Sequence, residues 1–386
     1  MGSYWLEGPA EPLDSTRLRG RADVEIVGGG VTGCACALAL AQAGLAVRVH
    51  ETREVASGAS GRNGGFALRG GAMGYDHARQ SLGRPRAREL WRFTEDALER
   101  LAGLAGTAFR RTGSVRLAWD REERGDLRAD YRALAEDGFV VEWLDEVETP
   151  GGVRFPGAIV HPEDGALHPA AWVRRLARLA ADAGVEIREQ SRVEALDQLE
   201  ADQVVLATDG YTRGLVPELE AAIRPTRGQV LVTAPLQSPV FARPHYARHG
   251  YDYWQQTPDR RLVIGGQRDA SLDTEWTSEE EPTERIQRRI EELARTLVGS
   301  LPPVTHRWCG IFGSTADLLP LVGELPGRPG TWVAAGYSGH GNVLGLACGE
   351  AVADAILGRP ADPVVAVFDP ARPESGLSEL EPRHVA

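Results

Sequence analysis

The stretch VEIVGGGVTGCACALALAQAGLAVRVHE, residues 24–51, decides the fold of this chain. Val24 to Val27 form a short β-rich run that stops at three glycines. Val31 to Ala43 are rich in Ala, Leu and Cys and end at Gly44, while Leu45 to Val49 are a second apolar run. The pattern predicts a right-handed parallel β-α-β unit with tight connections, and therefore an α/β fold of Rossmann type.

Gly28, Gly30 and Gly33 give this unit the spacing G-x-G-x-x-G between strand and helix. In that spacing the first glycine permits a tight turn, the second lets a pyrophosphate approach, and the third lets helix and strand pack closely. Glu51 closes the second strand, where a carboxylate can accept both hydroxyls of a ribose. The alternative is an ordinary tight turn and a solvated glutamate, but strand, helix and acid together favour dinucleotide binding.

A second glycine-rich stretch, SGASGRNGGFALRG, covers residues 57–70. It follows Glu51 by six residues, so we expect it to leave the edge of the sheet where the dinucleotide lies. Glycines there would let backbone N–H groups face a ligand. A flexible surface loop is the alternative, but such a loop seldom needs Arg62 and Asn63 between glycines, or Phe66 after them.

Composition narrows the class of protein. The 386 residues carry a net charge of −12, which argues against generic binding to nucleic acid or to an anionic membrane. All 43 basic residues are arginine, so no lysine can act as a base or form a Schiff base. The four cysteines show no disulfide framework or metal-ligand spacing. No signal peptide or apolar run long enough to span a membrane is recognisable, and we expect a cytoplasmic protein.

The rest of the chain alternates between two patterns. A helix followed by a strand recurs at 168–189, and a buried strand meets a turn at 202–210. Segments 224–236 and 260–269 alternate like antiparallel strands, and amphipathic helices are expected at 88–104, 122–135 and 280–299. We therefore expect a discontinuous cofactor domain, with a parallel sheet and a small β-meander, and an inserted α+β substrate domain on an antiparallel sheet. The cofactor domain is expected to comprise residues 1–80, 150–215 and 310–370, and the substrate domain residues 81–149 and 216–309. Residues 371–386 are expected to form a tail.

Three later stretches complete a resemblance: VVLATDGYT (204–212), WCGIFGSTADLLPLVG (308–323) and WVAAGYSGHGNVLGLACGEAVADAI (332–356). With the two glycine-rich stretches, they make the chain similar to FAD-dependent amine and amino-acid oxidoreductases of the D-amino acid oxidase superfamily. The branch it resembles holds glycine oxidase, monomeric sarcosine oxidase and gamma-glutamylputrescine oxidase. The resemblance spans Ser3 to about Pro370, nearly the whole chain.

The resemblance implies a reaction and leaves alternatives open. A small primary or secondary amine, or an amino acid with or without an N-substituent, would lose a hydride to flavin N5 and become an imine. Molecular oxygen would then be reduced to hydrogen peroxide. The lysine that sarcosine oxidases carry near the flavin has no counterpart here, so a dehydrogenase with another electron acceptor stays open. A flavin-binding accessory protein without turnover is a third possibility, and the protein could be a monomer or a homodimer.

The resemblance also implies which residues hold FAD, and that they hold it non-covalently. Some relatives tether the flavin through a cysteine, but Gly310 takes that position here and Cys309 is expected to be structural. The residues expected to contact the cofactor are Gly28, Gly30, Val31, Thr32, Gly33, Glu51, Thr52, Ala59, Ser60, Arg62, Asn63, Gly64, Gly65, Val193, Ala207, Thr208, Gly339, His340, Gly341, Asn342 and Val343.

Catalysis would centre on the flavin, so no catalytic side chain is named. The residues expected to contact the substrate are Tyr251, Tyr253, Gln255, Arg268, Arg69 and His340. Strand alternation puts the first three on one face and Trp254 on the other. Arg268, or failing that Arg69, would anchor a substrate carboxylate; otherwise the substrate is an amine without one. Core aromatics, a solvent-facing arginine and a structural histidine are the competing interpretations.

Overall fold

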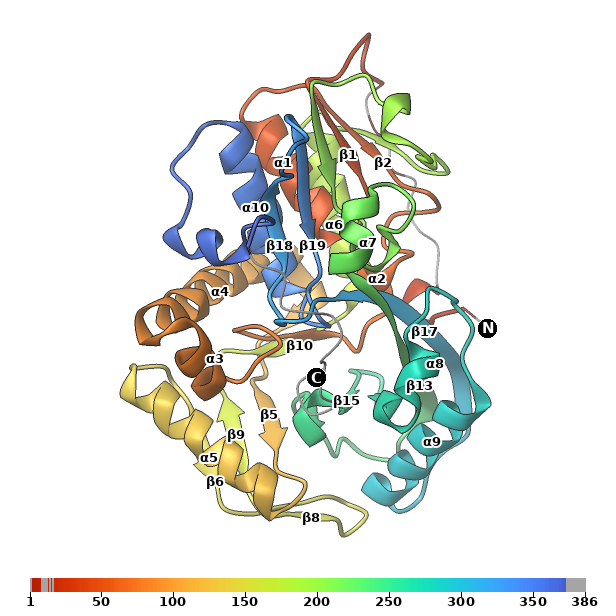
Figure 1. Ribbon diagram of the computed structural model, residues 1–386. Coiled ribbons are helices and arrows are strands. Elements are labelled where there is room, and N and C mark those ends of the chain that lie inside the picture. Colours follow the sequence, from red (N-terminus) through yellow and green to blue (C-terminus); the bar gives the residue numbers. More distant parts are fainter. Residues whose placement is uncertain (1, 8–12, 14, 16, 373–386) are drawn as a thin grey trace.

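The first β-α-β unit lies at the centre of a parallel sheet (Figure 1). The computed structural model describes residues 2–7, 13, 15 and 17–372. Within these residues the sheet has six strands, all parallel except for the β18–β19 pair. Their order is β11 (Glu186–Arg188), β2 (Val47–His50), β1 (Val24–Val27), β12 (Gln203–Leu206), β19 (Thr331–Ala335) and β18 (Leu321–Glu324).

Helix α1 (Val31–Gln42) is buried along most of its length because it packs against the sheet and two further helices. These helices are α6 (Pro169–Asp182) and α10 (Val343–Ile356). The Ala-, Leu- and Cys-rich sequence of α1 has no polar face, which suits a helix covered on several sides. The largest apolar cluster of the described residues lies here and includes Val24, Ile26, Cys34, Leu40 and Leu346.

A second sheet of eight strands makes the lower half of the molecule in Figure 1. Neighbouring strands are antiparallel except for β14 and β5, which run parallel. The order is β17 (Val304–Ser314), β13 (Arg224–Pro235), β16 (Arg261–Gly266), β15 (Asp252–Gln256), β14 (His245–Ala247), β5 (Ser114–Leu117), β9 (Ala158–His161) and β6 (Glu142–Leu144). The expected α/β class, with a largely antiparallel second sheet, is confirmed.

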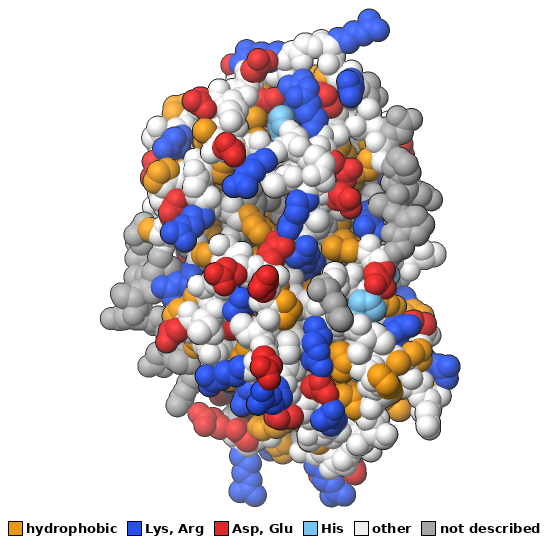
Figure 2. All heavy atoms as spheres, turned by 90° about the vertical axis from the view of Figure 1, so that its right-hand side faces the viewer, with side chains coloured by type: hydrophobic (Ala, Val, Ile, Leu, Met, Phe, Trp, Pro, Cys, Tyr) orange, Lys and Arg blue, Asp and Glu red, His pale blue; other side chains and the backbone are white. Residues whose placement is uncertain are grey.

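Helices cover this second sheet at both ends. Helix α9 (Glu284–Val298) packs on β13 and β16, and α5 (Arg121–Glu136) packs on β9. The face of the molecule that carries α9 shows acidic and arginine side chains interspersed, without a large patch of one sign (Figure 2). The remaining helices are α2 (Ala59–Arg62), α3 (Tyr75–Leu82), α4 (Arg84–Ala105), α7 (Pro217–Ala222) and α8 (Leu272–Glu275).

The described residues also form several short elements. Strands β3 (Phe66–Ala67), β10 (Gly165–Leu167) and β4 (Phe109–Arg110) form one small sheet, and β7 (Val147–Glu148) and β8 (Arg154–Phe155) form another. The 3-10 helices are η1 (Tyr4–Leu6), η2 (Gly106–Ala108), η3 (Leu196–Gln198), η4 (Asp209–Tyr211), η5 (Arg248–Gly250), η6 (Arg268–Ser271) and η7 (Pro363–Phe368). Among the described residues, no helix combines the length and apolar character needed to cross a membrane.

Two strands bear on the proposed domain division. Strand β9 falls in segment 150–215 and the end of β17 falls in segment 310–370, yet both pair within the eight-stranded sheet. No strand is common to the two large sheets of the described residues, and the division at these boundaries stays a proposal. Residues 373–386 of the expected tail lie outside the described residues.

Candidate active site

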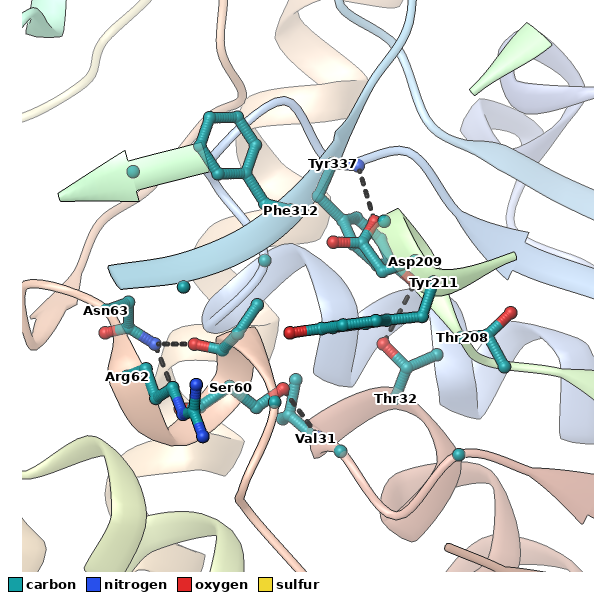
Figure 3. A pocket seen from close by; sticks show the side chains of 18 of the residues that line it. Val31, Thr32, Ser60, Arg62, Asn63, Thr208, Asp209, Tyr211, Phe312 and Tyr337 are labelled. Atoms are coloured by element: carbon teal, nitrogen blue, oxygen red, sulfur yellow. Dashed lines mark hydrogen bonds between the residues drawn. The ribbon is translucent and has the colours of Figure 1, made fainter. Parts of the chain in front are cut away.

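One cavity of about 800 Å³ is lined by both glycine-rich stretches and by the segment after β19 (Figure 3). Every residue expected to contact the cofactor lines this cavity, except Gly33 and Gly65. The two N-terminal stretches therefore meet the segment after β19, which lies far from them in the sequence. Their roles toward the cofactor stay proposals that rest on this placement.

The Gly28–Gly30 turn brings bare backbone to the cavity wall. Gly28 has φ +113°, and a Cβ there would lie 2.5 Å from the carbonyl oxygen of Ala207. Gly30 is the N-cap of α1, and a Cβ there would lie 2.9 Å from Ser60 Oγ. The Val31 N–H donates to the same Ser60 oxygen at 3.2 Å. A helix N-terminus beside bare backbone is a suitable seat for a phosphate.

Glu51 is fixed at the end of β2 by two backbone N–H groups. Its Oε2 accepts from Gly29 N at 2.9 Å and its Oε1 accepts from Arg53 N at 2.9 Å. A carboxylate oxygen has more than one lone pair, so both oxygens can still accept from ribose hydroxyls. The position of Glu51 and the bare backbone of the Gly28–Gly30 turn together fit a dinucleotide such as FAD.

Two predicted cofactor residues have structural positions instead of lining the cavity. A Cβ on Gly33 would lie 2.0 Å from Gly28 O, so this glycine serves the close packing of helix and strand. Gly65 has φ +78°, and a Cβ there would lie 2.3 Å from the Gln255 Nε2 atom. The Gly65 N–H donates to Asn63 Oδ1 at 2.9 Å, and contact of this glycine with the cofactor stays a prediction.

The end of the cavity where the sequence predicts the substrate is largely aromatic. Phe66, Tyr246, Tyr253 and Phe312 line it together with Arg268 and His340. The guanidinium of Arg268 lies 4.6 Å from the centre of the Tyr251 ring and 5.5 Å from that of Phe312. Such cation–aromatic contacts hold a buried guanidinium in place. Arg268, Tyr253 and His340 thus come together as the sequence predicts, while Phe312 and Tyr246 were not predicted.

Burial sets the charges of these groups. It lowers the pKa of His340 to about 4, so the imidazole is neutral near pH 7. It raises the pKa of Tyr253 to about 12, so this hydroxyl keeps its proton. It also lowers the pKa of Arg268, although an arginine stays charged in proteins. The substrate end therefore presents a cation and neutral groups.

Three expected substrate residues do not line the cavity. Arg69 pairs with Glu95 at 2.6 Å and with Asp164 at 3.3 Å, and faces a separate small cavity. Gln255 lies under the glycine-rich stretch, where its Nε2 donates to the carbonyls of Gly64 and Gly65. Tyr251 precedes β15 and packs under Arg268. Contacts of these three side chains with the substrate therefore stay predictions. Trp254 lies on the face opposite Tyr253 and stacks on His245.

Several residues that sequence reasoning missed organise the cavity. Asp209 accepts from the N–H groups of Gly313 at 2.9 Å and Gly336 at 2.8 Å, which ties η4 to β17 and to the end of β19. Thr32 Oγ1 donates to the Tyr337 hydroxyl at 3.0 Å (Figure 3). The stretch VVLATDGYT contains Asp209, but an aspartate in a turn gives no sign in the sequence of which backbone it will bind.

Gly310 lines the cavity and Cys309 does not, as the strand alternation implies. Burial raises the pKa of the Cys309 thiol to about 11, so its reactive thiolate form is scarce near neutral pH. This placement supports the proposal that FAD is held without a covalent bond.

Comparisons with known proteins agree with this site. The family model described as "FAD dependent oxidoreductase" (DAO) matches residues 23–355. The probable oxidoreductase OrdL of Rhizobium meliloti is 28% identical over 388 residues, covering 93% of this chain and 89% of the relative. Gamma-glutamylputrescine oxidoreductase of Escherichia coli is 28% identical over 382 residues, covering 90% and 86%.

Among solved structures, glycine oxidase from Geobacillus kaustophilus superposes with a TM-score of 0.74 at 24% identity, covering 92% of this chain and 100% of that one. At this identity the likeness bears on the fold alone. The likeness agrees with the family match, which covers most of the chain and identifies FAD as the cofactor. The chain belongs to the DAO family of FAD-dependent oxidoreductases.

Proposed function

We propose that the protein oxidises the C–N bond of a small amine or amino acid to an imine, with molecular oxygen reduced to hydrogen peroxide. The observation that carries the proposal is Arg268, a buried cation in an aromatic wall of the cavity that the cofactor motifs also line. Relatives named for glycine and for gamma-glutamylputrescine support the substrate class. FAD, when bound, supplies the acceptor for a hydride.

The chain's own part is to bind and orient the substrate. An Arg268 fork can hold a carboxylate through two parallel hydrogen bonds, and the aromatic rings enclose the remaining carbon atoms. The substrate nitrogen must be neutral before the adjacent C–H bond breaks, and neutral His340 adds no competing charge beside it. The C–H bond next to nitrogen is lost as a hydride, the nitrogen gives up a proton, and water then hydrolyses the C=N bond. Positioning accounts for much of the rate in such a scheme.

The floor of the cavity leaves room for a ligand. Gly228 and Gly310 come from β13 and β17 of the eight-stranded sheet and carry no side chain into the space. Tyr253 crosses this floor, and its ring meets Phe66 edge to face with centroids 6.1 Å apart. These features would leave space for a small substrate beside the cofactor.

A panel of amines and amino acids tests the proposal. The purified protein is mixed with each compound without air, and loss of the flavin's visible absorbance is recorded. Air is then admitted, and peroxide is measured. Rapid return of the absorbance with peroxide supports the oxidase, whereas slow return that an artificial acceptor speeds up would favour a dehydrogenase. A flavin that no compound bleaches would overturn the amine chemistry.

A further inference from the structure

The carboxylate of Glu280 binds three donors from three segments of the cofactor half. Arg53 follows β2 and donates from Nη1 to Oε2 at 2.6 Å. Arg62, at the end of α2, donates to the same oxygen at 2.6 Å. The Tyr211 hydroxyl in η4 donates to Oε1. All four residues line the cavity, and Figure 3 shows Arg62 and Tyr211 reaching into the same part of it.

Glu280 itself belongs to the other half of the molecule. It lies in the segment 276–283, which joins α8 to α9 beside β13. The sequence predicts an amphipathic helix over 280–299, with Pro282 near its first turn. In the structure α9 begins at Glu284, and residues 276–283 form an irregular connection between α8 and α9.

Strand β13 holds this segment from beneath. Gly228 and Val230 face the cavity, while the alternate residues Arg227 and Gln229 are buried on the opposite face. Arg227 donates to the carbonyl of Glu281 at 3.0 Å and pairs with Glu275 at 2.9 Å. Gln229 Oε1 accepts from Thr283 N at 2.9 Å. Both ends of segment 276–283 are therefore pinned, and its middle reaches the cavity through Glu280.

The interactions of Glu280 are strong ones for a half-buried group. The two arginines and the tyrosine hydroxyl lower the pKa of its carboxyl to about 2, so it stays ionised over the working pH range. Charge-assisted bonds of this kind are roughly twice as strong as neutral ones. Arg53 and Arg62 are held by the carboxylate beside the phosphate cradle formed by Gly30, Val31 and Ser60.

We propose that Glu280 is a positioning residue for the FAD site. Its carboxylate fixes Arg53 and Arg62 beside the cofactor's phosphates and fastens segment 276–283 across the cavity. Release of FAD would then require the contact between Glu280 and the two arginines to break. This role concerns retention of the cofactor and holds whichever amine is oxidised. In the alternative, the Glu280 carboxylate competes with the cofactor's phosphates for Arg53 and Arg62. Removing its charge would then slow the release of FAD.

The test measures release of FAD from the intact holoenzyme, as the growth of free-flavin fluorescence after dilution. Glu280→Gln removes the charge and keeps the shape, and we expect release at least about 10-fold faster than in the wild type, equivalent to ~1.4 kcal/mol. Glu279→Gln is the matched control, since Glu279 neighbours Glu280 and is exposed, and its release rate should equal that of the wild type. Unchanged release in Glu280→Gln would overturn the proposal, and slower release would show that the carboxylate competes with FAD.

Two further variants keep the proposal falsifiable if Glu280→Gln folds poorly. Tyr211→Phe removes only the hydroxyl donor, and we expect release about 3-fold faster. Arg53→Gln should also speed release, and the double variant with Glu280→Gln should be less than additive because the two residues act as a pair. Full additivity, or no effect of Tyr211→Phe, would contradict a shared clamp.

Discussion

Asn63 and Asn342 form a reciprocal amide pair, in which each Nδ2 donates to the other's Oδ1 at 3.1 Å. They are the two asparagines of the whole chain. Asn63 closes the first turn after α2, where Gly65 N donates to its Oδ1 at 2.9 Å, and Asn342 is the N-cap of α10, where its Nδ2 donates to Phe66 O at 2.7 Å. The pair thus joins the second glycine-rich stretch to the start of α10.

We expect Asn63→Ala and Asn342→Ala each to lower the free energy of unfolding of the holoenzyme by about 1–3 kcal/mol, because each leaves polar partners unsatisfied. The double variant should lose less than the sum, with a coupling of at least about 0.5 kcal/mol. Chemical denaturation of the four proteins measures this. Strict additivity would mean that the two amides act separately.

Gly30→Val should abolish tight FAD binding. The new side chain would start 2.9 Å from Ser60 Oγ and fill the approach to the helix N-terminus. Flavin content per chain after purification is the measurement. Gly103→Ala is the control, since nothing lies within 4 Å of a Cβ there and it should keep full flavin content. A yellow Gly30→Val protein with full FAD would count against the cradle.

Arg268→Ala should raise KM at least ~10-fold for an amino-acid substrate, equivalent to about 1.4 kcal/mol. Oxidation of a carboxylate-free amine of similar size should change little. Arg268→Lys keeps the positive charge but loses the two parallel N–H donors of the guanidinium. Its KM for the amino acid should lie between those of the wild type and Arg268→Ala. Steady-state kinetics with the matched pair of substrates decides. Equal losses on both would point to damaged packing against Tyr251 and Phe312, and would remove Arg268 as the anchor.

Stability should fall as the pH drops below about 6.5, the ordinary pKa of histidine. Burial lowers the pKa of His161 to about 3 and that of His245 to about 4, so both are neutral in the folded chain. As the pH falls, the unfolded chain binds these protons first. Each histidine then lowers the free energy of unfolding by up to about 1.4 kcal/mol per pH unit, until the pH reaches its pKa in the folded chain. His161→Gln should flatten the dependence of the unfolding free energy between pH 6.5 and about 4.5. An unchanged slope in His161→Gln would contradict the buried neutral state.

The sequence predicted the cofactor end of the site better than the substrate end, for a physical reason. Gly28, Gly30 and Glu51 act through local turn geometry within one β-α-β unit, so their spacing reveals their role. Gln255 and Arg69 could not be placed in this way, because their partners Gly64, Glu95 and Asp164 come from distant segments. Strand alternation correctly separated Tyr253 from Trp254, yet failed for Tyr251, which lies in the turn before β15.

The contact between Glu280 and the cofactor half shows the same limit. Nothing in the run of acidic residues at 279–281 distinguishes Glu280 from its neighbours. Only the pairing of β13 with β17 and the position of α2 bring Arg53 and Arg62 to it. Long-range pairing of this kind is fixed by tertiary packing, which a local pattern does not encode.

The central claim, that the bound flavin oxidises a C–N bond, is tested most directly by one anaerobic measurement. The holoenzyme is mixed with the most reactive amine or amino acid of the panel, and flavin bleaching and the carbonyl product of imine hydrolysis are quantified together. We expect the flavin absorbance to bleach, with one carbonyl molecule formed for each flavin reduced. Bleaching without a carbonyl product, or FAD that stays oxidised with every amine and amino acid, would contradict it.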